Sequence, residues 1–307
     1  MTKITVAVHG LGNIGRHVVD CLGAAQDLEC VGVVRRPASV GTSPFDLKGV
    51  PDFGSFDELV KKKKKPQVVI LCGPSRSVPD DAAFYLGKGV ATVDSFDIHT
   101  EIPALVRALD PLARKNKVAS ITAAGWDPGS DSVLRALFEA MTPSGTTFTN
   151  FGRGRSMGHS VAVRSIKGVA DATSITIPLG GGRHARLVYV LPEKRASFEA
   201  IKKKIAADPY FVHDPLEVRE VKTPEHMALV ADNSHGVLME RIGASGTVSN
   251  QRLTFDMRID NPALTAQVLV SCARAATRMS AGCHTIIDIP PVALLPGDRM
   301  EHIERLV

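Results

Sequence analysis

The chain has 307 residues, of which 44% are hydrophobic and 22% are charged, and its formal net charge is +5. A chain of this length buries a substantial core, and the length favours two domains over one. No apolar run approaches the roughly 18 residues that cross a bilayer, and the start shows no basic segment followed by an apolar one and a cleavage site, so we expect neither a membrane protein nor a secreted one.

Five short apolar runs of strand character lie in the first part of the sequence, and segments that suit helices alternate with them. The runs lie at residues 4–8, 30–34, 68–72, 91–93 and 118–122. Strands that alternate with helices are typical of a parallel sheet with helices on both faces. The pattern therefore predicts the α/β class with a doubly wound parallel sheet.

The sequence changes character after about Trp126, where longer apolar runs are separated by Gly-rich turns. These runs lie at residues 174–178, 187–191 and 253–259. Asn261 and Pro262 then precede a helical segment over 266–279, with Asn as the N-cap and Pro in the first turn. We expect a first domain at 1–122, to which residues 263–307 return, and a second, mixed α+β domain at 123–262.

A glycine motif follows the first predicted strand. The residues Gly10, Leu11, Gly12, Asn13, Ile14 and Gly15 match G-x-G-x-x-G between that strand and an amphipathic stretch. In a Rossmann fold, the first glycine allows a tight turn, the second lets the backbone approach a pyrophosphate, and the third allows close packing of helix on strand. We predict that residues 10–14 bind a dinucleotide cofactor, the alternative being a glycine-rich turn without a ligand.

The second predicted strand ends in Arg35 and Arg36. An NAD-binding enzyme commonly places an acid here for the ribose 2′-hydroxyl. Guanidinium groups offer charge-assisted donors to a phosphate, whereas a carboxylate would repel it. The two arginines therefore indicate NADP, unless both are simply surface residues of a loop.

Two more strand ends belong to the same edge of the sheet, where ligands of this fold bind. The third strand ends in Cys72, Gly73, Pro74 and Ser75, which we expect along the nicotinamide half of the cofactor. The fourth strand is followed by Asp94, Ser95, Phe96 and Asp97. We assign the first three of these to the cofactor and Asp97 to the substrate. Cys72 has the plain alternative of a small buried hydrophobic residue.

Two further segments place polar groups beside glycine. Gly125-Trp126-Asp127-Pro128-Gly129 follows the fifth strand and opens a helix, and Met157-Gly158-His159-Ser160 follows a Gly-rich loop and opens another. Each has a structural alternative, since Asp127 can cap a helix, Trp126 can pack in a core and His159 can fix a loop.

Together with Gly243-Ala244-Ser245-Gly246 and residues 261–266, these motifs resemble the signature set of the meso-diaminopimelate dehydrogenase family across essentially the whole chain. The resemblance implies NADP-dependent oxidative deamination of the D-configured centre of meso-2,6-diaminopimelate to L-2-amino-6-oxopimelate and ammonia, reversible as a reductive amination. The link between Pro178 and Arg183 is short, as in the shorter branch of the family, whose members accept other 2-keto acids and D-amino acids.

The resemblance also implies which residues bind the substrate. Because an unpaired buried charge is costly, two carboxylates and two ammonium groups need partners of opposite charge. The implied set is Asp97, Trp126, Asp127, Phe151, Met157, Gly158, Thr176, Arg186, His235 and Asn261. In it, Arg186 and Asn261 would hold carboxylates, with donors from Thr176 and His235 beside them.

The same set contains the implied catalytic groups. Asp97 and Asp127 would face ammonium groups, and Trp126 and Phe151 would wall the methylene chain. Asp97, Asp127 and His159 are all conceivable proton acceptors, and the residue types alone do not choose among them.

Other classes of protein share parts of this pattern. The alternative is another NADPH-linked enzyme of the same architecture, such as a dihydrodipicolinate reductase or a semialdehyde dehydrogenase. The former would need a His-Lys signature that is not found, and the latter an activated nucleophilic cysteine. A non-enzymatic NADP sensor would lack paired acids and donors in a second pocket.

The cysteines indicate the cellular compartment, and the charge pattern indicates which partners to expect. Five cysteines without a C-x-x-C pair favour a reducing compartment, the cytoplasm, over disulfides or a zinc site. The lysine run at 61–65 is typical of a solvated surface, and no motif supports nucleic-acid binding. The family resemblance implies at least a homodimer joined through the second domain.

Overall fold

The computed structural model describes residues 3–42, 46–152, 154–230 and 234–307. Contacts between residues divide the chain into two compact units, Met1–Ala136 with Pro262–Val307, and Leu137–Asn261. These contacts keep residues 123–136 with the first unit, whereas the sequence suggested a boundary between 122 and 123. The division expected from the sequence, 1–122 with 263–307 and 123–262, stays a prediction.

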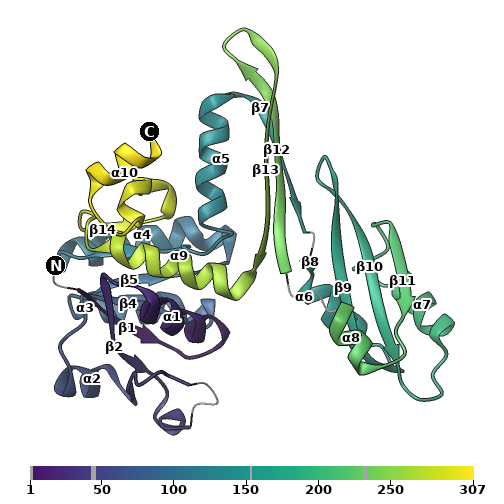
Figure 1. Ribbon diagram of the computed structural model, residues 1–307, viewed down its shortest axis with the longest axis horizontal. Coiled ribbons are helices and arrows are strands. Elements are labelled where there is room, and N and C mark those ends of the chain that lie inside the picture. The colour runs from purple at the N-terminus through teal and green to yellow at the C-terminus, as the bar shows by residue number, and fades with distance from the viewer. Residues whose placement is uncertain (1–2, 43–45, 153, 231–233) are drawn as a thin grey trace. The chain divides into compact units, whose positions relative to one another are not determined.

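The first unit is built on a parallel sheet of seven strands in the order β14-β6-β5-β4-β1-β2-β3 (Figure 1). Its strands are β1 (Ile4–His9), β2 (Leu28–Val34), β3 (Asp52–Phe53), β4 (Val68–Leu71), β5 (Ala91–Asp94), β6 (Ala119–Ile121) and β14 (Gly282–His284). Because β1 pairs in parallel with both β2 and β4, the strand order reverses beside β1. This is the predicted doubly wound sheet, and its five predicted strands are confirmed.

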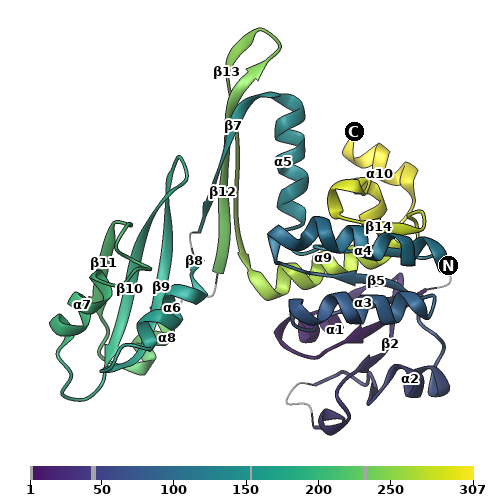
Figure 2. The same ribbon diagram turned by 180° about the vertical axis from the view of Figure 1, so that it is seen from behind.

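Helices cover both faces of this sheet (Figures 1 and 2). Helices α1 (Asn13–Ala24) and α9 (Asn261–Ala276) pack on one face, and α2 (Phe56–Lys62), α3 (Val78–Gly87) and α4 (Ile102–Lys115) pack on the other. The unit also contains α10 (Arg299–Leu306) and the first residues of α5 (Ser130–Met141). Short 3-10 turns lie at Pro37–Ser39, Ser75–Ser77, His99–Glu101, Ile286–Asp288 and Pro291–Leu294. Asn261 is the first residue of α9, where the sequence suggested an N-cap outside the helix.

Side chains of β1 enter two separate cores, because successive residues of a strand face opposite sides of the sheet. Val6 and Val8 pack in one core with Leu269 of α9. Ala7 packs in the other core with Leu86 of α3. Burial on both faces explains why β1 has a continuous apolar sequence and not an alternating one.

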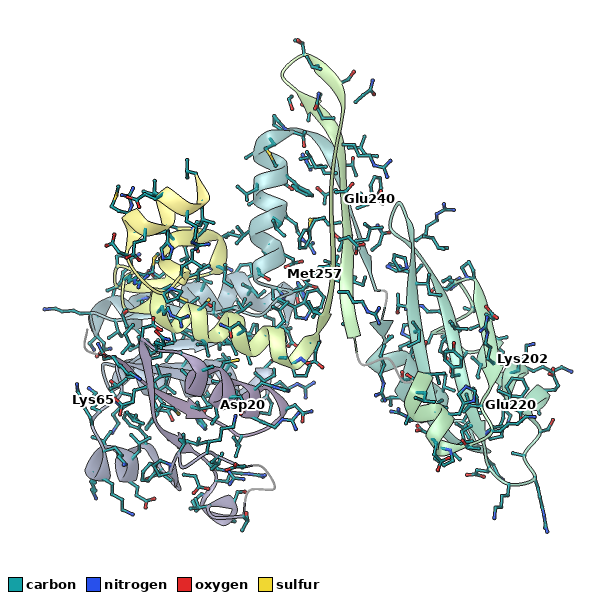
Figure 3. The ribbon with its side chains drawn as sticks, viewed as in Figure 1. Asp20, Lys65, Lys202, Glu220, Glu240 and Met257 are labelled. Atoms are coloured by element: carbon teal, nitrogen blue, oxygen red, sulfur yellow. The ribbon has the colours of Figure 1, made fainter. Side chains whose placement is uncertain are left out.

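The lysine run at 61–65 is exposed, and Lys65 lies on the outside of the first unit (Figure 3). The run begins in the last turn of α2, where positive side chains favour the carbonyl end of a helix. Lys62 pairs with Glu58 at 2.8 Å, and Lys65 Nζ donates to the Lys88 carbonyl at 2.7 Å. The run is thus a solvated surface segment, as predicted.

The second unit contains two sheets. The mixed sheet has the order β11-β10-β9-β8, and the antiparallel sheet has the order β13-β12-β7. Their strands are β7 (Ser144–Phe151), β8 (Gly154–Arg155), β9 (Val169–Gly180), β10 (Arg183–Pro192), β11 (Leu216–Glu220), β12 (Ser234–Ser245) and β13 (Val248–Asp260). The helices of this unit are α6 (Met157–Arg164), α7 (Phe198–Ala206) and α8 (Pro224–Val230). The mixed character predicted for the second part of the chain is confirmed.

The core of the second unit lies between α7 and the mixed sheet. Ile201 and Ile205, one helical turn apart on α7, pack with Val188 and Val190 of β10. Lys202 is exposed on α7 (Figure 3). This amphipathic spacing explains why residues 198–206 form a surface helix. Among the described residues, we find no helix with the length and hydropathy of a membrane span.

Candidate active site

The three glycines after β1 have different surroundings, which match different roles. Gly10 has a φ of +93°, and an added Cβ would lie 3.1 Å from the Cys72 carbonyl. A Cβ at Gly15 would collide with the Gly10 oxygen, whereas one at Gly12 would meet nothing within 4 Å. The first and third glycines are therefore required for packing, and the second faces open space.

The N-terminus of α1 opens into the same space. Its N-cap residue is Gly12, which makes no side-chain capping hydrogen bond. The first N–H groups of an uncapped helix, together with the helix dipole, favour an anion. The loop therefore has the stereochemistry that a pyrophosphate requires.

A pocket of about 700 Å³ lies over this loop, at the reversal of strand order. Of the predicted cofactor residues, 10–14, Arg35, Arg36 and 72–74 line it. The pocket also has lining residues that the sequence did not single out, namely His9, Val34, Ser39, Ser77 and Asp81. Ser75, Asp94, Ser95 and Phe96 do not line it. The assignment of the whole set to the cofactor stays a prediction.

The two arginines after β2 are not equivalent. Arg35 Nη1 forms an ion pair with Asp52 Oδ2 at 3.0 Å, and the Arg35 side chain is only 11% exposed. Burial opposes ionisation of Asp52, but the Gly41 N–H and the Arg35 guanidinium outweigh burial and hold the pKa of Asp52 below its ordinary value. Arg36 is exposed at the pocket. Arg35 therefore anchors the loop, and Arg36 is the better placed of the two to meet a ligand from solvent.

Asp94 holds together the ends of two neighbouring strands. Its Oδ1 accepts hydrogen bonds from the Phe96 N–H, Thr122 Oγ1 and the Ala123 N–H at 3.0, 2.8 and 3.2 Å. The side chain is completely buried, and burial raises the pKa of Asp94 to about 6. Phe96 is also buried, in the core beside α4. Both side chains are therefore buried beneath the loops at the sheet edge, and Asp94 fixes the backbone of these loops through its hydrogen bonds.

Asp97 and Cys72 differ in their exposure. Asp97 is exposed after β5, and Ser75 Oγ donates to Asp97 Oδ1 at 2.6 Å, which links two loops of the sheet edge. Burial raises the pKa of the Cys72 thiol, so this cysteine is a poor nucleophile. Cys72 is half-buried and lines the pocket over the glycine loop, and its assignment to the cofactor stays a prediction.

The turn between β6 and α5 is closed by its own backbone. The Gly125 N–H donates to the Pro128 carbonyl at 3.0 Å, and the Ser130 N–H donates to the Gly125 carbonyl at 3.1 Å. The Asp127–Pro128 peptide bond is cis, and Trp126 is only 5% exposed. The turn therefore holds Trp126 and Asp127 at the strand end beside that of Asp97.

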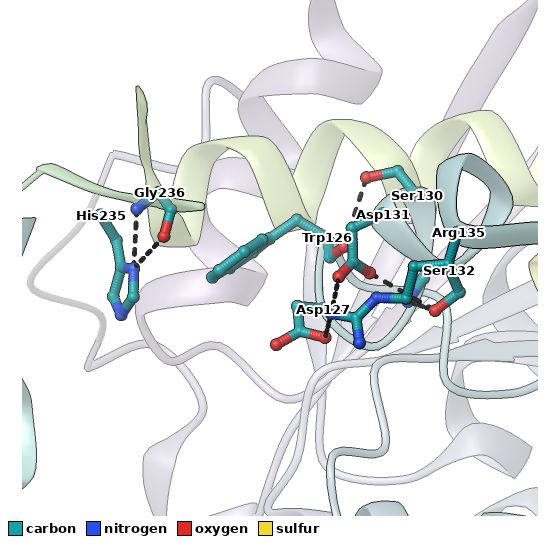
Figure 4. A network of polar contacts seen from close by, with 9 residues as sticks. Trp126, Asp127, Ser130, Asp131, Ser132, Arg135, His235 and Gly236 are labelled. Atoms are coloured by element: carbon teal, nitrogen blue, oxygen red, sulfur yellow. Dashed lines mark hydrogen bonds and ion pairs between the residues drawn. The ribbon is translucent and has the colours of Figure 1, made fainter. Parts of the chain in front are cut away.

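Asp127 belongs to a charged network with two residues that the sequence did not indicate (Figure 4). Arg135 Nη2 lies 2.7 Å from Asp131 Oδ2 and 3.7 Å from Asp127 Oδ1. The side chain of Asp131 is 0% exposed, and that of Asp127 is 11% exposed. Burial, followed by the charge of Asp127, raises the pKa of Asp131 to about 6 against the opposing effect of Arg135.

In the second unit, Arg186 and Thr176 face each other on β10 and β9. They are register partners, and Arg186 Nη1 donates to Thr176 Oγ1. Arg186 Nε donates to Asp214 Oδ2 at 2.6 Å, a partner that no sequence motif indicated. The guanidinium is fixed on two sides and 13% exposed. It is a rigid cation suited to a carboxylate.

Two histidines of the second unit, His159 and His235, are engaged in local hydrogen bonds. A carbonyl accepts only, so His159 Nε2 donates to the Tyr210 carbonyl at 3.1 Å and Nδ1 accepts from Ser156 Oγ at 2.8 Å. Burial and the charge of Arg186 lower the pKa of His159. His235 Nδ1 accepts from the Gly236 N–H at 2.7 Å (Figure 4), and burial lowers its pKa. The loop-fixing alternative thus suits His159.

The remaining predicted residues lie on β7, α6 and α9. Phe151 ends β7, where it is half-buried, and Asn261 opens α9, where it is exposed. Met157 and Gly158 begin α6, but their side chains lie outside the described part of the chain.

Comparison with known proteins identifies the family. A model described as the diaminopimelic acid dehydrogenase C-terminal domain matches residues 125–182. A meso-diaminopimelate D-dehydrogenase of Bacteroides fragilis is 48% identical over 307 residues, which cover 100% of both chains. The chain belongs to the meso-diaminopimelate D-dehydrogenase family.

Solved structures agree with membership in the meso-diaminopimelate D-dehydrogenase family. The C. glutamicum DAP dehydrogenase in complex with DAP has a TM-score of 0.78 at 28% identity, with 100% of both chains covered. An engineered D-amino acid dehydrogenase bound to NADP+ has a TM-score of 0.73 at 27% identity, again with 100% of both chains covered. The predicted family and the prediction of an oxidoreductase are therefore confirmed, and the dihydrodipicolinate reductase alternative is wrong.

Proposed function

We propose that this enzyme oxidatively deaminates the D-configured centre of meso-2,6-diaminopimelate with NADP, giving L-2-amino-6-oxopimelate and ammonia, and catalyses the reverse reductive amination of 2-keto acids. The observation that carries the proposal is the placement of a dinucleotide-sized pocket and two carboxylates, Asp97 and Asp127, at neighbouring strand ends of one sheet edge. Relatives named for this activity, one of them solved in complex with DAP, support it.

The first unit offers a fitting place for NADP. The space over Gly12 and the uncapped start of α1 suit the pyrophosphate, and the exposed Arg36 suits the 2′-phosphate. NADP, when bound, supplies the acceptor for the hydride. Ser75, Asp94, Ser95 and Phe96 are proposed to support the nicotinamide half, of which Asp94 and Phe96 act through the backbone that they fix.

The chain's own residues bind and orient the amino acid. Asp97 and Asp127 are proposed to pair with ammonium groups, and Trp126 and Phe151 to border the methylene chain. The hydrogen bonds of Arg186 to Asp214 and Thr176 leave further donors of its guanidinium for a bidentate carboxylate. Further proposed contacts are those of Met157, Gly158, His235 and Asn261.

Proton transfer is assigned to the carboxylates. His159 is a weak candidate, because both of its ring nitrogens are hydrogen-bonded within the second unit. Asp97 and Asp127 remain, and both act by removing a proton from the reacting ammonium group or from the water that attacks the imine. Rate enhancement rests mainly on positioning and on fixed charges.

The test is turnover with a panel of stereoisomers. Purified protein is mixed with NADP and meso-diaminopimelate, and NADPH is followed by its absorbance. The LL and DD isomers and simple D-amino acids are assayed in parallel. We expect turnover of the meso isomer, none of the LL isomer, and a large loss in Asp127→Asn. Asp20→Asn is the matched control, because Asp20 pairs with Lys48 on the outside of α1. Absence of turnover with every compound would overturn the proposal.

The proposed function is accompanied by a proposed compartment and a proposed oligomeric state. All five cysteines are free thiols, which suits the cytoplasm that we propose. The proposed homodimer, or higher homo-oligomer, is to be measured by sedimentation equilibrium.

A further inference from the structure

Arg135 is shared by two carboxylates in an unequal way. It lies 2.7 Å from Asp131 and 3.7 Å from Asp127. Asp131 is in the first turn of α5, where the helix dipole favours a negative charge, and Arg135 follows one turn later. The closer partner is also the completely buried one. The guanidinium is therefore held mainly by Asp131, and Asp127 receives only part of its charge.

We propose that Asp131 and Arg135 are positioning residues that orient Asp127 and set how much negative charge it presents to the substrate's ammonium group. This inference rests on the proposed function, since it takes Asp127 as the carboxylate at the reacting amino group. Neither residue needs to touch the substrate. Arg135 restrains one oxygen of Asp127, and Asp131 keeps Arg135 from neutralising Asp127 fully.

The electrostatics of the cluster support this division. Asp127 from the turn and Arg135 from α5 are the charged groups that act on Asp131. Asp94 is the buried carboxylate beneath the same turn, and its hydrogen bonds go to Phe96, Thr122 and Ala123. The shorter distance and the complete burial of its side chain make Asp131 the main partner of Arg135. Changes at positions 131 and 135 should therefore act on Asp127 in opposite directions.

The competing explanation is a purely structural ion pair. The chain contains a matched pair of that kind, Asp110 and Arg114, with the same spacing on α4 and a distance of 2.8 Å. That pair is more exposed, at 29% and 63% of the side chains. Arg114→Gln is therefore the control for removing an arginine from an i,i+4 pair on a helix of the same unit.

The experiment compares the pH dependence of kcat/KM for meso-diaminopimelate in Arg135→Gln, Asp131→Asn and the control. Removing the cation takes away the positive partner of the Asp127 carboxylate, so the acid limb in Arg135→Gln moves to higher pH. Removing the competing carboxylate gives Asp127 the whole cation, so the acid limb in Asp131→Asn moves to lower pH. Arg135→Lys, which keeps the charge, restores most of the wild-type profile. The affinity for NADP and the profile of Arg114→Gln stay unchanged.

A second readout does not depend on turnover. Trp126 is the single tryptophan and adjoins Asp127 in the chain, so its fluorescence against pH follows the charge of the turn. The midpoint should move in opposite directions in Asp131→Asn and Arg135→Gln. Shifts in the same direction, or the absence of any shift in folded variants, would overturn the inference. Opposite shifts in a protein that does not oxidise meso-diaminopimelate would uphold the network and reject the proposed function instead.

Discussion

Replacement of Asp94 by Asn tests whether a buried carboxyl group beneath the sheet edge makes folding depend on pH. The Asn side-chain oxygen can accept the same hydrogen bonds from Phe96, Thr122 and Ala123. The substitution therefore keeps the geometry of the loop and removes the titration. Any constant effect of the new amide group cancels when one variant is compared at two pH values.

The magnitude follows from the pKa. Burial raises the pKa of Asp94 to about 6, whereas an Asp of the unfolded chain titrates near about 3.9. The folded protein binds this proton more tightly, so the stability that Asp94 contributes is complete below about pH 4 and is lost as pH rises through about 6. Since one pKa unit equals about 1.4 kcal/mol, the total loss is roughly 3 kcal/mol. About half of it falls between about pH 5 and about pH 8.

The assay is unfolding in urea, followed by the fluorescence of Trp126. This residue is the single tryptophan and lies buried in the same unit as Asp94. Relative to the wild type, Asp94→Asn should gain about 1.5 kcal/mol in the free energy of unfolding from about pH 5 to about pH 8. Thr122→Val, which removes a hydrogen bond to the ionised carboxylate, should lose stability more at the higher pH. A difference between Asp94→Asn and wild type that is equal at both pH values would refute the reasoning.

Three other substitutions probe the cofactor end, the substrate end and the second unit. Arg36→Ala should raise KM for NADP about tenfold in steady-state assays, because one charge-assisted hydrogen bond is lost. KM for NAD should stay nearly unchanged, and equal effects on both cofactors would count against the 2′-phosphate contact. Arg186→Ala should lower kcat/KM by a factor equivalent to about 1.5 to 3 kcal/mol, and a loss below a few-fold would remove Arg186 from the site. Arg241 is 4% exposed and donates to the carbonyl and hydroxyl of Thr142. Arg241→Met should therefore lower the free energy of unfolding by about 3 kcal/mol in urea titrations followed by circular dichroism, and a change below about 1 kcal/mol would show that these hydrogen bonds are replaced by water.

The central sheet could be predicted because its strands are buried on both faces and therefore have continuous apolar sequences. The strands that were missed lack that signal. β3 has two residues and β14 has three, too few for a pattern. β12 carries Glu240 and Arg241 side by side, which interrupts its apolar sequence. Both side chains are nevertheless buried. Arg252 pairs with Glu240 at 2.6 Å (Figure 3), and Arg241 donates hydrogen bonds to backbone carbonyls.

The glycine loop after β1 could be predicted because its motif constrains the backbone, and its residues 10–14 line a pocket. The assignment of the site residues stays a prediction. Partners of functional side chains have no such signal, and Asp131, Arg135 and Asp214 were missed for that reason. An Asp and an Arg four residues apart predict only a helical ion pair, and the sequence contains another such pair at Asp110 and Arg114. Only the fold shows that one of these pairs adjoins Asp127.

The contact between the loops after β1 and β4 limits how cofactor preference can change. A Cβ at Gly10 would press on the Cys72 carbonyl, and the Cys72 N–H donates to the His9 carbonyl at 2.7 Å. Neither loop can be remodelled without disturbing the other, so we expect a change in the proposed preference for NADP to involve Arg36 and Ser39, which line the same pocket. We therefore expect the glycine loop after β1 to vary little among related enzymes, whereas the residues after β2 should differ between enzymes that prefer different nucleotides.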